Sequence, residues 1–293
     1  MDWTPGDISS DIEDRRGEGG GFGQFGMGGG GLGIVGFIVL LIISLITGHN
    51  FLGGVLGGGG APAVSNERPM NRGPVEASPT EQRDVQLISF VLDDAQKTWT
   101  GIFAAHNRTY RHAKLVLFRG ETYSGCGTAQ AATGPFYCPE DEKVYIDLSF
   151  WNELERFGGD TGDFAQAYVI THELGHHVQK LLGIEARERQ LAEGNPAQEN
   201  PLSVDLELQA DCFAGLWGHT TEQRNIVHPD DVAGALRAAA AVGDDHLQRM
   251  SGRAVSPESF THGSSAQREH WFRQGLEGGQ VSSCATFNGR LAP

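Results

Sequence analysis

The sequence predicts an α+β domain in which helices dominate and the sheet is small, preceded by one transmembrane helix. Apolar residues recur at helical spacing in five stretches, and two shorter stretches have the β-branched and aromatic content typical of strands. An uncharged run of Ile, Leu, Val and Phe lies ahead of all of them. The predicted helices are 84–103, 164–182, 204–217, 230–242 and 264–276, and the predicted strands are 114–118 and 143–148.

The apolar run divides the chain into four parts. Residues 1–31 are polar and rich in glycine without apolar periodicity, which predicts a disordered tail. Residues 32–56 are the predicted transmembrane segment, because a bilayer core takes about 20 apolar residues. Residues 57–80 form a linker with many Pro, Ala, Asn and Ser residues, and residues 81–293 form the globular domain. A buried core helix and a cleaved signal peptide are the alternative interpretations of the run.

The charge and the cysteines restrict the partners and the compartment. The net charge of −15 argues against nucleic-acid binding, which needs a basic surface. We interpret the excess of acidic residues as a feature that keeps the protein soluble. Cys126 and Cys138 are close in sequence and separated by chain rich in Gly, Ala and Thr, so we expect a disulfide between them. Cys212 and Cys284 are left as the second pair, unless the four are free buried thiols. Disulfides require an oxidising compartment.

The orientation in the membrane is inferred from the cysteines and from positive charge. Arg15 and Arg16 precede the apolar run, whereas Arg68 and Arg72 follow it, and this weak bias permits the N-terminus inside. We therefore expect a cell-membrane protein with a single-pass anchor, whose domain lies on the extracytoplasmic side, periplasmic or extracellular.

The predicted helix 164–182 carries a metal-binding pattern, His-Glu-Leu-Gly-His (HExxH). His172 and His176 are four residues apart and lie on one face of a helix, so both imidazoles can bind one ion. Glu173 is rotated by about 100° from His172, which directs it to the water beside the metal rather than to the metal. The pattern predicts a zinc site with Glu173 as catalytic base. The alternative is a pair of structural histidines on a core face.

The next predicted helix, 204–217, offers a third ligand. Glu207 and Asp211 lie one turn apart among mostly apolar residues, where carboxylates are costly to bury unless they are partnered. A catalytic zinc takes three protein ligands and keeps one position for water, so we expect Glu207 to bind the metal. Asp211 would accept the ring N–H of His172 and fix its orientation. A pair of solvated carboxylates on an exposed stripe is the alternative.

With these motifs the chain resembles the gluzincins, in which HExxH is followed by a helix bearing ExxxD, and most closely the bacterial family of neutral zinc metallopeptidases. The resemblance covers the domain from about residue 84 onward, and the glycine-rich tail with one membrane span fits as well. It implies a zincin-like (gluzincin) fold, Zn²⁺ held by His172, His176 and Glu207, and Glu173 as catalytic residue. The other matching stretches are 126–127, 134–139, 144–147, 207–212 and 261–264.

Several further residues are weaker candidates. Residues 144–147 are either an edge strand that binds a peptide substrate or an ordinary core strand. His262, in Thr-His-Gly-Ser before the last predicted helix, either acts in catalysis by stabilising the tetrahedral intermediate or caps a loop. Tyr137 and Tyr145 are alternative donors to this intermediate. His177 points away from the ligand face and is expected to be structural or exposed.

The sequence therefore predicts a membrane-anchored zinc metallopeptidase that acts on peptide or protein substrates. Zinc lowers the pKa of water toward ~7, and Glu173 takes the proton of this water. One alternative is a non-catalytic, zinc-stabilised binding or chaperone-like membrane protein. Another is a membrane-assembly protein in which the apolar run and the tail carry the function.

Overall fold

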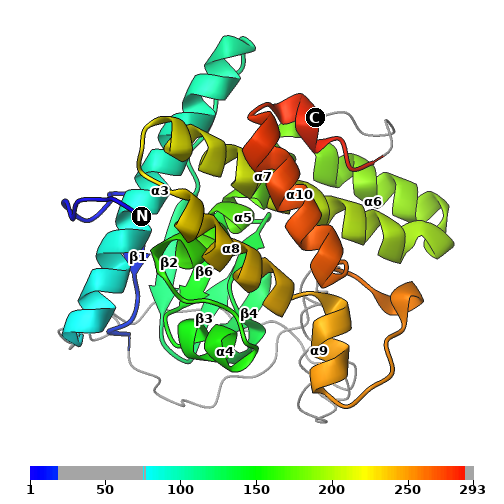
Figure 1. Ribbon diagram of the computed structural model, residues 1–293, viewed down its shortest axis with the longest axis horizontal. Helices are drawn as coiled ribbons and strands as arrows, with labels where there is room; N and C mark the ends of the chain where they lie inside the picture. The colour runs from blue at the N-terminus through cyan, green and yellow to red at the C-terminus, as the bar shows by residue number, and fades with distance from the viewer. Residues whose placement is uncertain (19–74, 76, 288–293) are drawn as a thin grey trace, which may run out of the picture.

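The computed structural model describes residues 1–18, 75 and 77–287. α5 packs against α3, α7 and α8, and Figure 1 shows α3 on the side of the N-terminus, with α6 and α10 on the opposite side. The predicted helix-dominated α+β class with a small sheet is confirmed. The elements are β1 (Ile12–Asp14), α3 (Pro79–Ala105), β2 (Lys114–Phe118), β3 (Glu121–Ser124), β4 (Gly127–Gln130), β5 (Phe136–Cys138), β6 (Lys143–Asp147), α4 (Phe150–Arg156), α5 (Asp163–Leu182), α6 (Ile184–Gly194), α7 (Glu199–Gln223), α8 (Pro229–Ala241), α9 (Asp244–Met250) and α10 (Ser265–Gly278).

The main sheet has the strand order β1-β2-β6-β5, and a separate hairpin pairs β3 with β4. β1, β2 and β6 are parallel, whereas β5 is antiparallel to β6. The interpretation of 144–147 as an edge strand is wrong, because β2 lies on one side of β6 and β5 on the other. The edge strand next to β6 is β5, which has only three residues and leaves no alternating pattern in the sequence.

The first 18 residues are folded against the domain. The Met1 amine forms an ion pair with Asp231 at 2.6 Å, and the Trp3 indole N–H donates to Asp163 at 2.7 Å. β1 then pairs with β2. The prediction of a disordered tail over 1–31 is therefore wrong for residues 1–18. Glycine dominates the composition of the predicted tail, whereas a three-residue strand depends on its neighbour for stability and is too short for a periodic pattern.

Arg16 joins the end of this N-terminal segment to the start of α3. Its buried guanidinium lies 2.6 Å from Asp14 and 2.9 Å from Glu81. The predicted transmembrane segment at 32–56 and most of the predicted linker at 57–80 lie outside the described residues. Among the helices of the described part, none has the length and apolarity that a membrane crossing requires.

Three glycines allow α5, α7 and α10 to approach one another closely. A Cβ at Gly175 of α5 would lie 3.0 Å from the Cα of Ala210 in α7. A Cβ at Gly215 of α7 or at Gly275 of α10 would clash with the backbone of the facing helix. Because interaxial distance depends on the side chains at the contact, these positions set how near the three helices lie.

Both expected disulfides are present. Cys126–Cys138 joins the turn of the β3–β4 hairpin to the edge strand β5, and Cys212–Cys284 joins α7 to the chain after α10. Free thiols are therefore not found at these four positions.

Replacing both Cys212 and Cys284 by Ala should lower the free energy of unfolding by about 4 kcal/mol, because this disulfide restricts a long loop in the unfolded chain. The two cysteines are 72 residues apart, whereas Cys126 and Cys138 are 12 residues apart. The corresponding loss for Cys126 and Cys138 should be smaller, about 3 kcal/mol. Urea unfolding of both double variants measures these losses. A larger loss for the short loop would contradict the argument from loop length.

Candidate metal centre

α5 presents the HExxH residues on a buried helix. The helix begins with Asp163 in its first turn, where a carboxylate complements the helix dipole. It ends at Gly183, whose φ of 76° gives the left-handed conformation common at helix C-termini. The rings of His172 and His176 are one turn apart, with centroids separated by 4.9 Å. Glu173 is buried beside them.

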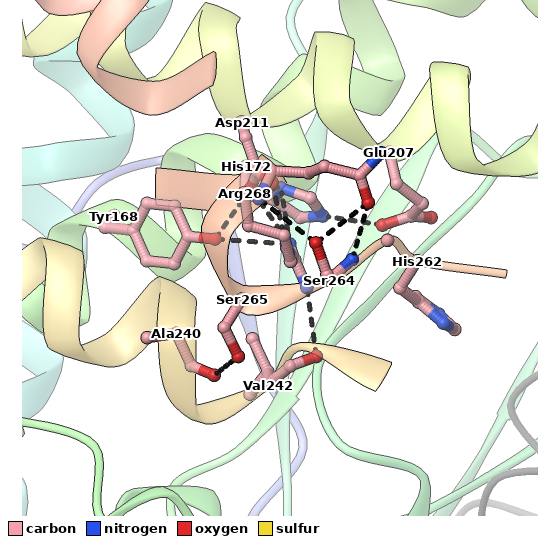
Figure 2. A network of polar contacts seen from close by, with 12 residues as sticks. Tyr168, His172, Glu207, Asp211, Ala240, Val242, His262, Ser264, Ser265 and Arg268 are labelled. Atoms are coloured by element: carbon pink, nitrogen blue, oxygen red, sulfur yellow. Dashed lines mark hydrogen bonds and ion pairs between the residues drawn. The ribbon is translucent and has the colours of Figure 1, made fainter. Parts of the chain in front are cut away.

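α7 places Glu207 opposite the two histidines, and Figure 2 shows its carboxylate turned toward the His172 ring. Nε2 of His172 lies 3.2 Å from one Glu207 oxygen, and Nε2 of His176 lies 3.5 Å from the other. The two Nε2 atoms are 3.3 Å apart. Ligand atoms about 2.0–2.1 Å from a tetrahedral zinc ion are about 3.3–3.4 Å from one another. The three side chains therefore have the spacing that a zinc ion requires.

Acceptors on the outer side of each ring fix the direction of both imidazoles. Nδ1 of His172 donates to Asp211 at 2.8 Å, as the sequence predicts, and Nδ1 of His176 donates to the side-chain oxygen of Gln179 at 2.9 Å. Gln179 in turn donates to the carbonyl of Leu206, which sets the orientation of its amide. Because Nδ1 carries the proton in each ring, both neutral imidazoles turn an Nε2 lone pair inward, as metal ligands do.

The charges around these rings favour a cation. Burial by itself lowers the pKa of His172, but Asp211 and Glu207 raise it to about 10. The pKa of His176 is raised as well, since Glu207 outweighs the effect of burial. A proton or a metal ion between the rings and Glu207 is thus stabilised by two carboxylates.

Arg268 of α10 completes the network behind His172, and Figure 2 shows it against Asp211. Its Nε and Nη2 donate to the two oxygens of Asp211 at 2.8 and 2.9 Å, and the Tyr168 hydroxyl donates to the same carboxylate at 2.6 Å. Burial tends to raise the pKa of Asp211, but Arg268 and His172 lower it to about 2. Asp211 is therefore a charged, fully buried acceptor for the His172 ring.

Arg268 is not among the residues predicted from the sequence, although the sequence contains a signal for it. In α10, Arg268, Phe272 and Leu276 recur every four residues and all are buried. A single arginine on an otherwise apolar face needs a buried anion. Gln179 left no such signal, because a polar residue near a helix end is common on surfaces.

Glu173 and His262 both line the cavity at the metal centre. Glu173 makes no hydrogen bond or ion pair with another described residue, and burial raises its pKa although the two histidines oppose this rise. His262 lies on the loop between α9 and α10. Nδ1 of its ring contacts Thr261 at 2.9 Å and Asp244 at 3.5 Å. The cap of α10 is Ser264 rather than His262, because the Ser264 hydroxyl accepts the backbone N–H of Gln267.

The other predicted donors have partners elsewhere. Tyr137 lines the cavity wall, but its hydroxyl donates to Nδ1 of His177 at 3.0 Å. Nε2 of His177 donates to the carbonyl of Arg111, so this buried histidine connects β5 with the chain before β2. The Tyr145 hydroxyl donates to Asp141 at 2.6 Å and does not line the cavity.

The cavity has a volume of about 210 Å³ and is open to solvent. The metal ligands form one part of its wall, and the edge strand β5 with the preceding Gly134 and Pro135 forms another. Apolar side chains from α4, α5 and α9 supply much of the remainder. The cavity therefore lies between the candidate ligands and the edge strand β5.

Comparison with known proteins agrees with this geometry. The chain is 44% identical to the uncharacterized protein YpfJ of Escherichia coli K12 over 290 residues, which covers 98% of this chain and 99% of YpfJ. It is 43% identical to the uncharacterized protein Rv2575 of Mycobacterium tuberculosis H37Rv over 190 residues, covering 61% of this chain and 64% of that relative. No solved structure matches. Residues 1–287 match the family described as "Putative neutral zinc metallopeptidase". With the match spanning nearly its full length, this chain belongs to that family of zinc metallopeptidases.

Proposed function

We propose that the protein is a zinc-dependent peptidase that hydrolyses peptide bonds in peptide or protein substrates. The observation that carries this proposal is the 3.2–3.5 Å spacing of ligand atoms from His172, His176 and Glu207. Two imidazoles and one carboxylate are a donor set of catalytic zinc sites, in which one coordination position remains for water. When bound, zinc supplies Lewis acidity to the scissile carbonyl and lowers the pKa of water toward ~7.

Glu173 is the proposed general base. It takes a proton from the attacking water and later donates this proton to the leaving amine. Its carboxylate lines the cavity and has no other partner among the described residues.

His262 is the proposed donor to the carbonyl oxygen that gains negative charge during the reaction. Thr261 and Asp244 hold the Nδ1 side of the ring, while its Nε2 has no hydrogen-bond partner within the described part of the chain. One oxygen of Asp244 also accepts the backbone N–H groups of residues 261–263 at 2.7–3.0 Å. A donor that is already fixed stabilises developing charge without reorganisation.

The edge strand β5 is the proposed guide for the substrate backbone. An extended peptide can add to the exposed edge of a sheet through main-chain hydrogen bonds. β5 is the last strand of the main sheet, and its Phe136 and Tyr137 line the cavity. Its disulfide to the β3–β4 hairpin limits its movement away from β6.

Metal analysis combined with a peptide-library assay tests this function. The purified protein should contain about one zinc per chain and should cleave peptides, and a chelator should remove both zinc and activity. Added zinc should restore cleavage. Bound zinc without cleavage of any peptide in the library would contradict the enzyme and favour a non-catalytic zinc-stabilised module.

We also propose that the protein is attached to a membrane through its apolar run at 32–56, with the domain on the extracytoplasmic side. The two disulfides support an oxidising compartment for the domain. Membrane fractionation, together with alkylation of thiols before and after reduction in intact cells, tests this location. Protein recovered only in the soluble fraction with four free thiols would contradict it.

A further inference from the structure

One face of α4 lines the cavity near the metal centre. Phe150, Glu153 and Phe157 are spaced by three and four residues, so they lie on the same side of this helix, and all three line the cavity. A hydrogen bond from His246 of α9 to the carbonyl of Phe157, at 2.8 Å, holds α9 next to the end of α4. This part of the cavity, the pocket discussed below, therefore lies between α4 and α9.

On the α4 and α9 side of the cavity, the lining side chains are apolar apart from one carboxylate. Arg268 also lines the cavity, but its guanidinium is paired with Asp211. Val169, Val242 and Leu247 line the cavity together with the two phenylalanines of α4. Val169 lies on α5 one turn before Glu173, so the pocket adjoins the proposed general base. A substrate side chain next to the scissile bond would reach it.

Glu153 is that carboxylate. The side chain is half-buried and makes no hydrogen bond or ion pair with any other described residue. Burial raises its pKa, Arg156 opposes this rise from one turn away, and Asp147 adds to it. Arg156 is exposed on α4 and forms no ion pair with Glu153. A carboxylate among apolar groups is costly unless a cation or a donor meets it.

We propose that Glu153 makes this pocket selective for a lysine or arginine side chain of the substrate. The proposal rests on the proposed peptidase function. Lysine and arginine carry a long apolar stem that packs along apolar walls and a cationic tip that requires an anion. The pocket supplies both in that arrangement, since the aromatic and aliphatic side chains form its walls and Glu153 provides the charge. An acidic substrate side chain would be repelled, and a neutral one would leave Glu153 unpaired.

The test compares peptides that differ at one position, Lys, Gln, Leu or Glu, on the zinc-loaded full-length protein. The wild type should cleave the Lys peptide with a kcat/KM about 10- to 100-fold above that for Gln, the range expected for a hydrogen bond to a charged group. In Glu153→Gln the Lys-to-Gln ratio should fall to about 1, and Glu153→Lys should favour the Glu peptide. Glu155→Gln, on the exposed side of α4 and outside the cavity, is the matched control and should keep the wild-type ratio.

A second readout does not depend on turnover. The affinities of the same peptides for the Glu173→Gln variant, measured by fluorescence anisotropy, should follow the same order and lose it when Glu153→Gln is added. If the wild type cleaved and bound the Lys and Gln peptides equally well, the proposal would be overturned, while the peptidase function would stand. An unchanged ratio in Glu153→Gln would overturn it as well. Absence of cleavage with intact selective binding would contradict the peptidase function alone.

Discussion

A Glu173→Gln protein should bind zinc like the wild type but hydrolyse peptides with a kcat lower by about 10²- to 10⁴-fold, the usual contribution of a general base. The substitution preserves the shape of the side chain and removes only its ability to take a proton. Because Glu173 has no hydrogen-bond partner among the described residues, no structural contact is lost. Zinc content by mass spectrometry and steady-state kinetics on one peptide measure the two effects separately.

His172→Ala is the control that should lose both zinc and hydrolysis, since it removes one of the three converging ligand atoms. The pair of variants thus separates proton transfer from metal binding. If Glu173→Gln cleaved peptides at the wild-type rate, the assignment of the base would be wrong, whatever the metal content.

Replacing Arg268 by Met should lower the free energy of unfolding by about 3–5 kcal/mol, because it leaves the charge of Asp211 buried without its main partner. Arg268 is 4% exposed and Asp211 is 0% exposed, so water does not compensate either charge. The affinity for zinc should fall too, by about 10- to 100-fold, since Asp211 orients the His172 ring. Chemical denaturation and competition with a zinc chelator measure these two quantities.

The double variant Arg268→Met, Asp211→Asn is the control for this prediction. It removes both charges, so part of the lost stability should return, while zinc affinity should remain reduced because the neutral amide is a weaker acceptor for His172. A single Arg268→Met variant as stable as the wild type would show that Asp211 is compensated in another way.

The sequence alone predicts the fold class and the two helices of the candidate site, because both follow from local patterns. HExxH fixes two histidines on one helical face, and two carboxylates on a mostly apolar helix demand a partner. The structure brings His172, His176 and Glu207 together and places Asp211 behind His172. The catalytic role of Glu173 and the zinc itself stay predictions.

The remaining parts of the site depend on contacts between distant segments. Asp244 accepts backbone N–H groups of the loop that carries His262, 17 to 19 residues later in the sequence. Arg268 binds Asp211, which lies 57 residues earlier. The Asp244 contact leaves no periodic pattern, whereas the four-residue repeat of Arg268, Phe272 and Leu276 marks Arg268 as buried but does not name its partner. The edge position of β5 likewise depends on which strands pair, and strand order does not follow from the composition of a three-residue segment.

The place of β1 in the sheet limits how this chain can relate to a bilayer. Residues up to Arg16 and residues from Glu81 onward belong to one folded body, and these two side chains are in direct contact. When two segments of one chain pack together in a single folded domain, the chain between them crosses a membrane an even number of times or not at all. An odd number would leave β1 and its neighbour β2 in separate compartments, where they could not share hydrogen bonds. The β1–β2 ladder therefore requires residues 1–18 and the candidate metal centre to lie in the same compartment.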